Sequence, residues 1–347
     1  MLSKSPELLN TIDDYIVGEK LGSGGYSDVY LCQHRVSEKE YAIKFIKKKI
    51  NGRCKMHRIR QEVKVLDKIN HRNIIKLYDY FEDDQHVYLV LEYITGRDLS
   101  KYYRKGPPKR SHAVGIIRQV VSALRYCHNN NIIHRDIKNG NILIDDNRRV
   151  KLTDFGLCAV KTSPTQTMSD DLGTLRYKPP EMIRRELYDE KVDIWSLGIT
   201  TYVLLTGRFP FDGSDKESIT KSIMSDTIDY AILSQRDISF IKSMLSREPH
   251  ERLDINQIAK HEWFKCYCRK CHRRKLSSAT AAAAEDPSKT SDKTGSTSHR
   301  SHRSGRSGRS GRSGKSNKSR SGRSNKSKSG KSRSRSARSR VDKSTRT

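Results

Sequence analysis

The middle of the sequence reads His134-Arg135-Asp136-Ile137-Lys138-Asn139-Gly140-Asn141, and a short apolar run separates it from Asp154-Phe155-Gly156. Asp136 is spaced to accept a proton from an attacking hydroxyl group. Asn141 and Asp154 offer oxygen ligands for the Mg²⁺ ions that neutralise the phosphates of ATP. These residue types in this order predict a site of phosphoryl transfer.

A glycine-rich segment lies upstream and reads Leu21-Gly22-Ser23-Gly24-Gly25-Tyr26-Ser27-Asp28-Val29. Because glycine has no Cβ atom, such a backbone can lie close over phosphate groups. Read alone, the segment fits a glycine-containing β-turn equally well. Further along, Tyr41-Ala42-Ile43-Lys44 stands in an alternating apolar stretch that has the pattern of a strand.

Together these motifs resemble the eukaryotic protein kinase family over roughly residues 15–264. The glycine-rich segment is similar to the family pattern GxGxxGxV, with Ser27 at the third glycine. The resemblance implies that Lys44 holds the ATP phosphates and that Glu62 pairs with Lys44. Helical apolar spacing around Arg60–Leu66 turns Glu62 toward the cleft, although a solvated carboxylate is its alternative role.

The resemblance continues in Gly173-Thr174-Leu175-Arg176-Tyr177-Lys178-Pro179-Pro180-Glu181, which is similar to the family pattern GTxxYxAPE with Pro179 in place of Ala. It implies a buried, bidentate ion pair between Glu181 and Arg252. It also implies that Asp193, in the later stretch 193–198, holds the backbone of the segment 134–141, which we call the catalytic loop.

An α+β, two-lobed protein kinase fold is therefore expected. The small lobe, at about 15–92, would be a mostly antiparallel sheet with one key helix, and the larger, mainly helical lobe would cover about 95–264. Residues 1–14 would form an N-terminal extension and 265–347 a separate tail. Strand patterns stand at about 15–20, 29–33, 41–47, 75–81 and 87–92.

A nucleotide site follows from the same resemblance. The segment Leu21 to Val29 would cover the phosphates, and the hinge would pair adenine through the Glu92 carbonyl and the Ile94 amide. Ordinary core packing is the alternative role for the apolar residues of this site. The residues that match the walls of the adenine slot are Leu21, Val29, Ala42 and Leu143, with Leu91 at its rear.

Lys138, two residues after Asp136, resembles the serine/threonine signature of the family and would stabilise the transferring γ-phosphoryl group. Thr174 fits the same subclass. We therefore expect an enzyme that uses ATP and Mg²⁺ to phosphorylate protein Ser and Thr hydroxyls. The alternatives are a noncatalytic scaffold tethered to polyanions by its tail, and a nucleic-acid protein in which the kinase domain is secondary; retention of every catalytic residue favours the enzyme.

Within the family, the stretch 179–213 looks most like the Aurora kinases, and 74–91 is similar to both Aurora and Polo-like kinases. This implies a regulator of cell division, acting on the spindle or chromosomes. A checkpoint or calmodulin-kinase-like group is the neighbouring alternative. The sequence leaves open whether an activating protein partner takes part.

One departure from the Aurora and Polo-like pattern concerns regulation. Those enzymes place a phosphorylatable Thr three residues before the Gly of GTxxY, where this chain has Asp170. We hypothesise that Asp170 supplies Arg135 with a weaker but permanent anion, because a carboxylate carries less charge than a phosphate. The alternatives are a merely solvated Asp170 and phosphorylation at a nearby position, namely Thr165, Thr167 or Ser169.

The resemblance to protein kinases gives a partial prediction of substrate preference. Asp98 resembles the acidic residue with which basophilic kinases hold an Arg three positions before the acceptor. Asn139-Gly140 stands where many of those kinases have Pro-Glu, so a second acidic contact is missing. A weakened preference for basic substrates is expected.

The net charge of +29 is mostly a property of the tail. Residues 265–347 hold 26 Lys and Arg against 4 Asp and Glu, which leaves +7 for residues 1–264. With Arg-Ser-Gly repeats and few apolar residues, the tail cannot bury enough surface to offset chain entropy, and disorder is expected. Its charge predicts a nucleic acid or another polyanion as partner, without base-specific readout because the basic repeats carry no interleaved aromatic residues for base stacking.

Two remaining features concern metal and location. Cys266, Cys268, Cys271 and His272 suggest a zinc site, but four ligands within seven residues lack the second knuckle of ordinary zinc modules, and free thiols are the alternative. The N-terminus lacks an apolar signal region, and no stretch approaches the length of a membrane helix. We expect no membrane partner and a nuclear location, with the cytoplasm as a second compartment.

Overall fold

The five longest strands form one antiparallel sheet in the order β1-β2-β3-β7-β6. The computed structural model describes residues 11–24, 27–50, 53–163 and 165–265, so the cysteine–histidine cluster, the rest of the tail, and Gly25 and Tyr26 lie outside the described residues. The strands are β1 (Tyr15–Ser23), β2 (Ser27–His34), β3 (Glu40–Lys47), β6 (Leu77–Glu82) and β7 (His86–Glu92).

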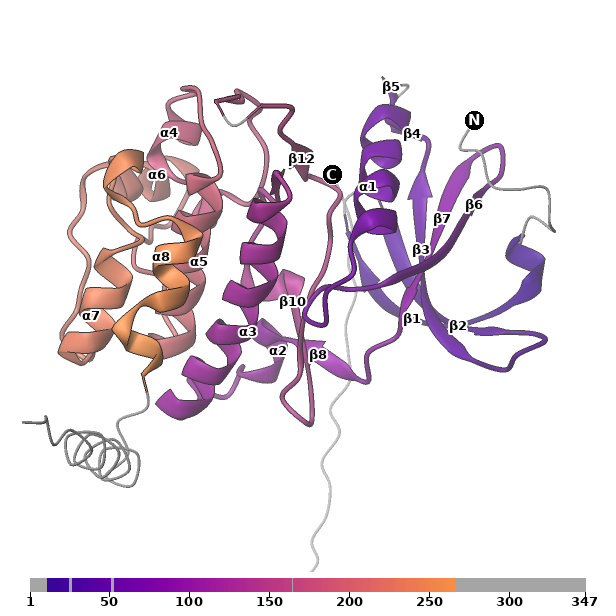
Figure 1. Ribbon diagram of the computed structural model, residues 1–347, viewed down its shortest axis with the longest axis horizontal. Helices are drawn as coiled ribbons and strands as arrows, with labels where there is room; N and C mark the ends of the chain where they lie inside the picture. Colours follow the sequence, from indigo (N-terminus) through magenta and orange to yellow (C-terminus); the bar gives the residue numbers. More distant parts are fainter. Residues whose placement is uncertain (1–10, 25–26, 51–52, 164, 266–347) are drawn as a thin grey trace, which may run out of the picture. The chain divides into compact units, whose positions relative to one another are not determined.

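Alternation along β3 gives this sheet two buried faces. Ile43 packs on one side with Tyr15 and Tyr88, in an aromatic cluster of the small lobe. Ile46 belongs to the other face, which the helix α1 (Met56–Lys68) covers (Figure 1). The 3-10 turn η1 (Ile12–Asp14) precedes the sheet, and the short strands β4 (Lys49–Ile50) and β5 (Arg53–Cys54) lead into α1.

Helix α1 is held by apolar residues at helical spacing. Ile59, Val63 and Leu66 are 4%, 1% and 3% exposed, because positions i, i+4 and i+7 fall on one face. Glu62 is adjacent to this stripe and is buried with it. The sequence of α1 thus places a carboxylate inside the small lobe.

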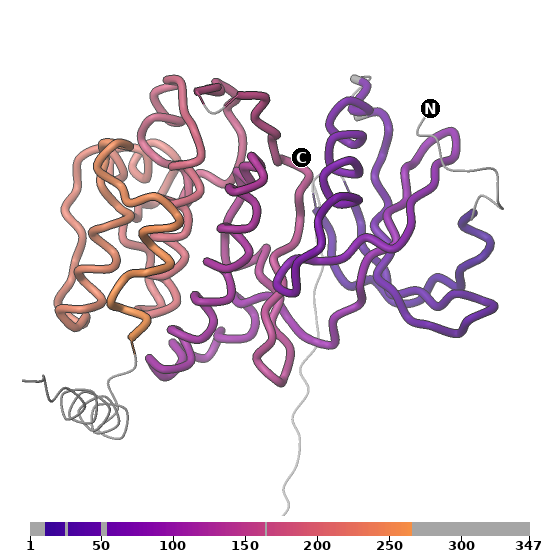
Figure 2. Tube along the Cα trace, in the orientation of Figure 1, coloured from indigo at the N-terminus to yellow at the C-terminus, as the bar shows by residue number. Residues whose placement is uncertain are grey.

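The chain leaves the small lobe after β7 and enters the large lobe through β8 (Gly96–Asp98) (Figure 2). A Cβ atom at Gly96 would collide with the carbonyl oxygen of Ile144, so this crossing requires glycine. Strand β8 pairs with β10 (Ile142–Asp145), which pairs with β11 (Val150–Leu152). Between them lie α2 (Leu99–Tyr102), β9 (Ile132–Ile133) and the 3-10 turn η2 (Asn139–Asn141); β9 pairs with β12 (Ala159–Val160).

The large lobe is built around α3 (Arg110–Asn129) and α5 (Lys191–Thr206). Thirteen of the sixteen residues of α5 are buried, so other elements surround this helix on all sides. The remaining elements are η3 (Leu175–Tyr177), α4 (Pro180–Ile183), α6 (Lys216–Ser225), α7 (Gln235–Lys242), η4 (Pro249–Glu251), α8 (Ile255–Lys260) and η5 (Glu262–Phe264). None of the helices in the described part of the chain combines the length and apolar character that a membrane crossing needs.

The predicted α+β fold with a strand-rich small lobe and a helical large lobe is confirmed. Each of the five expected strands is present, and Glu62 lies on the expected helix.

Candidate active site

Strand register brings the predicted nucleotide residues together. Lys44 lies opposite Val29 of β2, and Ala42 lies opposite Leu91 of β7. Because side chains two residues apart on a strand point to the same face, Ala42 and Lys44 face the same side of the sheet. On the other side of β2, Gly22 of β1 also lies opposite Val29. Four strands, β1, β2, β3 and β7, therefore bring the predicted nucleotide residues into adjacent positions.

The Lys44 ammonium group lies between two carboxylates. Its Nζ donates to Oε1 of Glu62 at 2.7 Å and to Oδ1 of Asp154 at 2.9 Å. Burial lowers the pKa of Lys44, but the charges of Glu62 and Asp154 outweigh burial and raise it. The charge of Lys44 in turn lowers the pKa of Asp154 to about 2. These contacts join β3, α1 and the segment after β11.

Asp154 adopts a left-handed backbone conformation, with φ of +63°. Such a conformation is uncommon for a residue other than glycine and is concentrated at functional sites. Its neighbour Thr153 donates from both the backbone N–H and the hydroxyl to the carbonyl of Asn141, at 2.9 and 3.1 Å. At Gly156, a Cβ atom would meet Oε2 of Glu62 at 3.2 Å. The two predicted metal ligands are thus held on directly bonded segments.

Asp136 receives three side-chain hydrogen bonds. Lys138 Nζ donates to Oδ2 at 2.7 Å and Asn141 Nδ2 donates to the same oxygen at 2.9 Å. The hydroxyl of Thr174 donates to Oδ1 at 3.2 Å and itself accepts from Lys138 at 2.9 Å. The carboxylate is buried but lies next to a basic side chain and a hydroxyl, the environment expected where an alcohol is oriented for attack.

The backbone before Asp136 is anchored to the core of the large lobe. Oδ2 of Asp193 accepts from the His134 N–H at 2.9 Å and Oδ1 accepts from the Arg135 N–H at 2.8 Å. His128 Nε2 lies 2.9 Å from Oδ2 as well. Burial tends to raise the pKa of Asp193, but the hydrogen bond from His128 and the other donors hold it below its usual range. Asp193 is fully buried in α5, so the catalytic loop is fixed to that helix.

Arg135 connects the catalytic loop to the segment before Gly173. Its φ is +64°, and its guanidinium group is 2.7 Å from Oδ2 of Asp170 and 3.1 Å from the hydroxyl of Tyr188. Tyr188 also donates to the backbone carbonyl of Asp170 at 3.1 Å. Next in the chain, Asp171 pairs with Lys178 at 2.5 Å. The contact that the sequence suggested between Asp170 and Arg135 is present.

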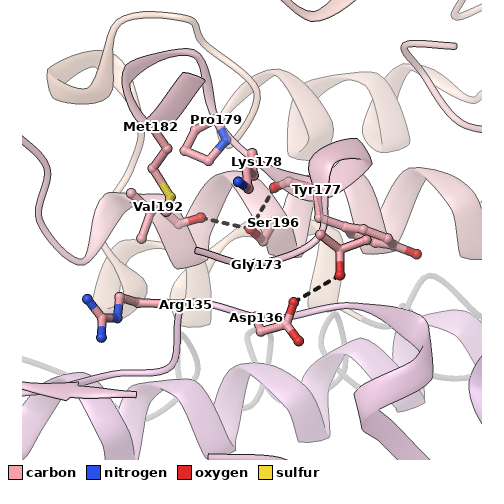
Figure 3. Close-up of a pocket in the computed structure, with 10 residues that line it drawn as sticks. Arg135, Asp136, Gly173, Tyr177, Lys178, Pro179, Met182, Val192 and Ser196 are labelled. Atoms are coloured by element: carbon pink, nitrogen blue, oxygen red, sulfur yellow. Dashed lines mark hydrogen bonds between the residues drawn. The ribbon is translucent and has the colours of Figure 1, made fainter. Parts of the chain in front are cut away.

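The segment after Thr174 is held by buried contacts (Figure 3). The Ser196 hydroxyl donates to the carbonyls of Tyr177 and Val192, at 2.8 and 3.0 Å. At Gly173, φ is +86° and a Cβ atom would lie 2.9 Å from the Arg135 carbonyl, so glycine permits the close approach. A small cavity of about 10 Å³ remains between this segment and the catalytic loop.

The predicted pair of Glu181 and Arg252 is bidentate. Its two N–O distances are 2.6 and 2.8 Å, and the side chains are 2% and 0% exposed. Arg252 also lies 5.1 Å over the ring of Trp195. This pair ties α4 to the segment after η4.

The described residues of the glycine-rich segment lie at the end of β1, at Gly24 and at the start of β2. The Gly24 N–H donates to the Ser27 carbonyl at 2.7 Å, and Ser23 donates to Asp28, which also pairs with Lys20 at 2.9 Å. Among the residues that the structure describes, apart from Gly22 and its two chain neighbours, no atom lies within 4 Å of a Cβ atom built on Gly22.

The residues predicted for the hinge and for the far wall of the adenine slot lie on β7, between β7 and β8, and on β10. Glu92 is the last residue of β7, and Ile94 packs against the core before β8 begins. Leu143 of β10 lies opposite Asp98 of β8. The roles of the nucleotide-binding and catalytic residues remain predictions.

The donor set suits a magnesium nucleotide. Among the residues that the structure describes, no group of three or more His, Cys, Asp or Glu could hold a metal ion. Mg²⁺ instead takes one or two protein oxygens and completes its shell with phosphate and water. An amide oxygen of Asn141 and the carboxylate of Asp154 fit that requirement.

Sequence reasoning missed Tyr188 and His128. Tyr188 is distant in sequence from Arg135, and no local pattern indicates their contact. His128 follows Val121 and Leu124 at helical spacing on the buried face of α3, so a polar residue in that stripe is a signal for a buried partner.

Asp98, the residue predicted to hold a substrate Arg, makes its contacts within its own segment. The side chain caps α2, accepting from the Lys101 N–H at 3.0 Å and from the Ser100 hydroxyl, and it pairs with Lys101 Nζ at 3.1 Å. The carboxylate is already satisfied by its own segment.

Comparison with known proteins agrees with this geometry. The protein kinase domain family matches residues 15–264. The chain is similar to an Aurora kinase of Dictyostelium discoideum, with 34% identity over 73% of this chain and 66% of that protein. It is 36% identical to Aurora kinase C of Mus musculus, over 75% of this chain and 95% of that protein.

A second group of relatives is longer. Serine/threonine-protein kinase PLK4 of Drosophila willistoni is 34% identical over 82% of this chain. The chain spans only 35% of the length of that protein. Both groups that the sequence resembles are thus among its relatives.

Proposed function

The chain belongs to the protein kinase family, and from that premise we propose that it transfers the γ-phosphoryl group of ATP to serine and threonine hydroxyls of proteins. The observation that supports this most directly is the convergence of Lys44, Glu62 and Asp154 at 2.7 and 2.9 Å. A scaffold has no chemical need for this arrangement. The names of the relatives favour Ser and Thr as acceptors.

In the proposed reaction, the protein positions groups more than it reacts. Lys44 binds the α and β phosphates, and Asp136 orients the substrate hydroxyl and accepts its proton. Lys138, 2.7 Å from Asp136, stabilises the charge of the transferring group. When bound through Asn141 and Asp154, Mg²⁺ neutralises phosphate charge.

Labelled phosphate transfer tests the proposal. The wild type and an Asp136→Asn variant would be incubated with Mg²⁺, γ-labelled ATP and a generic protein substrate. The proposal predicts labelled phosphoserine and phosphothreonine with the wild type, and a loss of at least about a thousandfold in the variant with nucleotide binding retained. A wild type that binds nucleotide but labels nothing would point to a noncatalytic scaffold.

The cellular role belongs to the same proposal. Similarity to Aurora kinases and PLK4 supports a kinase that regulates cell division, with a checkpoint or calmodulin-kinase-like role as the neighbouring alternative. We propose residues 15–264 as the catalytic domain and 265–347 as a tail that binds nucleic acid or another polyanion, because the tail carries most of the net charge. Such binding favours a nuclear location, with the cytoplasm as a second compartment.

A cellular comparison tests this role. Proteins labelled in a cell extract by the wild type but not by Asp136→Asn would identify the substrates. If the labelled proteins include no component of the division apparatus, the role in cell division is wrong even though the kinase activity stands.

A further inference from the structure

Three basic residues stand close together in the chain, on α2 and in the turn that follows it. After α2 the backbone continues in turns, since the Tyr103 N–H donates to the Leu99 carbonyl at 3.1 Å and the Gly106 N–H donates to the Tyr103 carbonyl at 2.9 Å. Positions i, i+3 and i+4 of such a backbone are neighbours. Lys101, Arg104 and Lys105 occupy these positions and are exposed. We call these three residues the α2 cluster.

The α2 cluster lies beside the catalytic loop. On the inner side of the same turns Leu99 is 1% exposed, and Tyr102 and Tyr103 pack against the core. Helix α2 contacts η2, the turn Asn139–Asn141, which itself carries no charged side chain. The cluster therefore begins on a helix that contacts the predicted catalytic loop and continues into the turn after that helix.

The Asp98 carboxylate compensates only Lys101 among the three residues of the cluster. Asp98 accepts from Ser100 and from the Lys101 backbone, and its second oxygen pairs with Lys101 Nζ at 3.1 Å. Its side chain is only 11% exposed. An arginine of a substrate would have to displace Lys101 from this carboxylate. Asp98 therefore offers a poor site for a basic peptide.

Two charges of the cluster are without a compensating carboxylate. Within the described ranges, neither Arg104 nor Lys105 forms an ion pair, and like charges at this spacing destabilise a helical turn. A ligand that compensates these two charges must be acidic.

We propose that the α2 cluster selects protein substrates that carry Asp, Glu or phosphorylated residues to one side of the acceptor hydroxyl. This inference rests on the proposed kinase activity and names its substrate class. Acidic groups near Arg104 and Lys105 satisfy the uncompensated charges and steer the peptide into the site. The preference is the reverse of the basic preference that Asp98 suggests from sequence alone.

A positional peptide scan tests the inference with the full chain. Serine peptides with an otherwise alanine-rich sequence would carry Glu, Arg or Ala at each of the five positions before and after the acceptor, and kcat/KM would be measured for each. We expect Glu to exceed Ala, and Ala to exceed Arg, over adjacent positions on one side of the acceptor. At those positions the ratio of kcat/KM for Glu over Arg should be about tenfold or more.

A charge-reversal variant assigns the effect to the cluster. In Arg104→Glu/Lys105→Glu the Glu-over-Arg ratio should fall at least about tenfold at the same positions, with the all-alanine peptide changed less than twofold. The matched control, Lys39→Glu/Lys260→Glu, makes the same charge change at two exposed positions on other elements. The control variant should leave the Glu-over-Arg ratio of kcat/KM unchanged. The basic tail is present in the wild type and in both variants.

Several outcomes would overturn the inference. A wild type that prefers Arg, or that shows no positional preference, is incompatible with it. So is an equal loss of the ratio in the control variant, which would indicate a general effect of net charge. If no peptide is phosphorylated, and Asp136→Asn behaves like the wild type, the proposed kinase activity itself is wrong and the substrate class falls with it.

Discussion

At the scale of single residues, Lys44 controls the ionisation of Asp154. The pKa of Asp154 is about 2 rather than 3.8, chiefly because of the Lys44 charge. A carboxyl group whose pKa is lowered by folding contributes stability at pH values above its unfolded pKa. That contribution is lost as the pH falls through the folded pKa, here between about pH 4 and about pH 2.

This gives a pH prediction for Lys44→Met. Without the ammonium group, the pKa of Asp154 should rise toward its ordinary value, because the charge that lowers it most is gone. The free energy of unfolding should then fall less steeply between pH 4 and pH 2 than in the wild type. Urea unfolding at several pH values would measure this.

Lys48→Met is the matched control, because Lys48 pairs with Glu82 at 3.0 Å in a more exposed setting. If Lys44→Met and Lys48→Met show the same pH dependence as the wild type, Lys44 does not set the ionisation of Asp154.

Other single residues show what sequence reasoning can and cannot reach. Lys44, Glu62 and Asp136 were predictable because each belongs to a short motif whose residue types the chemistry requires. The capping role of Asp98 was not predictable, because an aspartate before a helical turn can either cap the helix or bind a ligand. The neighbours Ser100 and Lys101 decide for the cap, and the contacts they make become visible only in the folded chain.

At the scale of elements, the buried pair of Glu181 and Arg252 joins α4 to the segment after η4. In Glu181→Gln, the fully buried guanidinium group of Arg252 loses its charged partner, and we expect a loss of about 3–5 kcal/mol in the free energy of unfolding. The double variant Glu181→Leu/Arg252→Met should be much closer to the wild type, since no charge is left buried alone. Denaturant unfolding would measure both.

The control for this prediction is an exposed pair. Lys265 and Glu262 are 2.9 Å apart, with side chains 54% and 72% exposed, so Glu262→Gln should change stability by less than about 1 kcal/mol. A loss in Glu181→Gln no larger than in this control would contradict the role given to the buried pair.

The segment around Asp170 supports a prediction about regulation. If Asp170 is the permanent anion for Arg135, then Asp170→Ala free of phosphate on this segment should lose up to about fivefold in kcat/KM. The effect is modest because the Asp170 side chain is 53% exposed. Asp170→Glu should retain most of the activity.

Ser169→Ala is the neighbouring control and should have little effect. If phosphate-free Asp170→Ala keeps full activity, the carboxylate lies near Arg135 but does not contribute to activity through it.

The contact between Asp170 and Arg135 was predictable from the motif spacing. The hydroxyl of Tyr188, which also contacts Arg135, comes from a distant part of the chain and was not predicted.

At the scale of the whole molecule, charge is divided unequally along the chain. A chain that ends at Phe264 carries +7 of the total +29. Removing residues 265–347 should therefore weaken binding to a DNA fragment sharply and flatten the dependence of the binding constant on salt concentration. The kcat/KM for a short neutral peptide should stay within about twofold.

Titrations of the full and shortened chains at several KCl concentrations would measure this. An unchanged salt dependence in the shortened chain would place polyanion binding on residues 1–264 instead.

The two-lobed fold was predictable at this scale because strand and helix periodicities are regular. The short pair β4 and β5 was missed because two-residue strands carry no period.

The attachment of the catalytic loop to α5 also has a consequence for solvent exchange. The amide protons of His134 and Arg135 are donated to Asp193, which is fully buried in a helix that is itself surrounded. Their replacement by deuterium should therefore need opening of the lobe interior and proceed as slowly as in the centre of α5. A loop that performs chemistry would then exchange like the protein interior instead of like a surface loop.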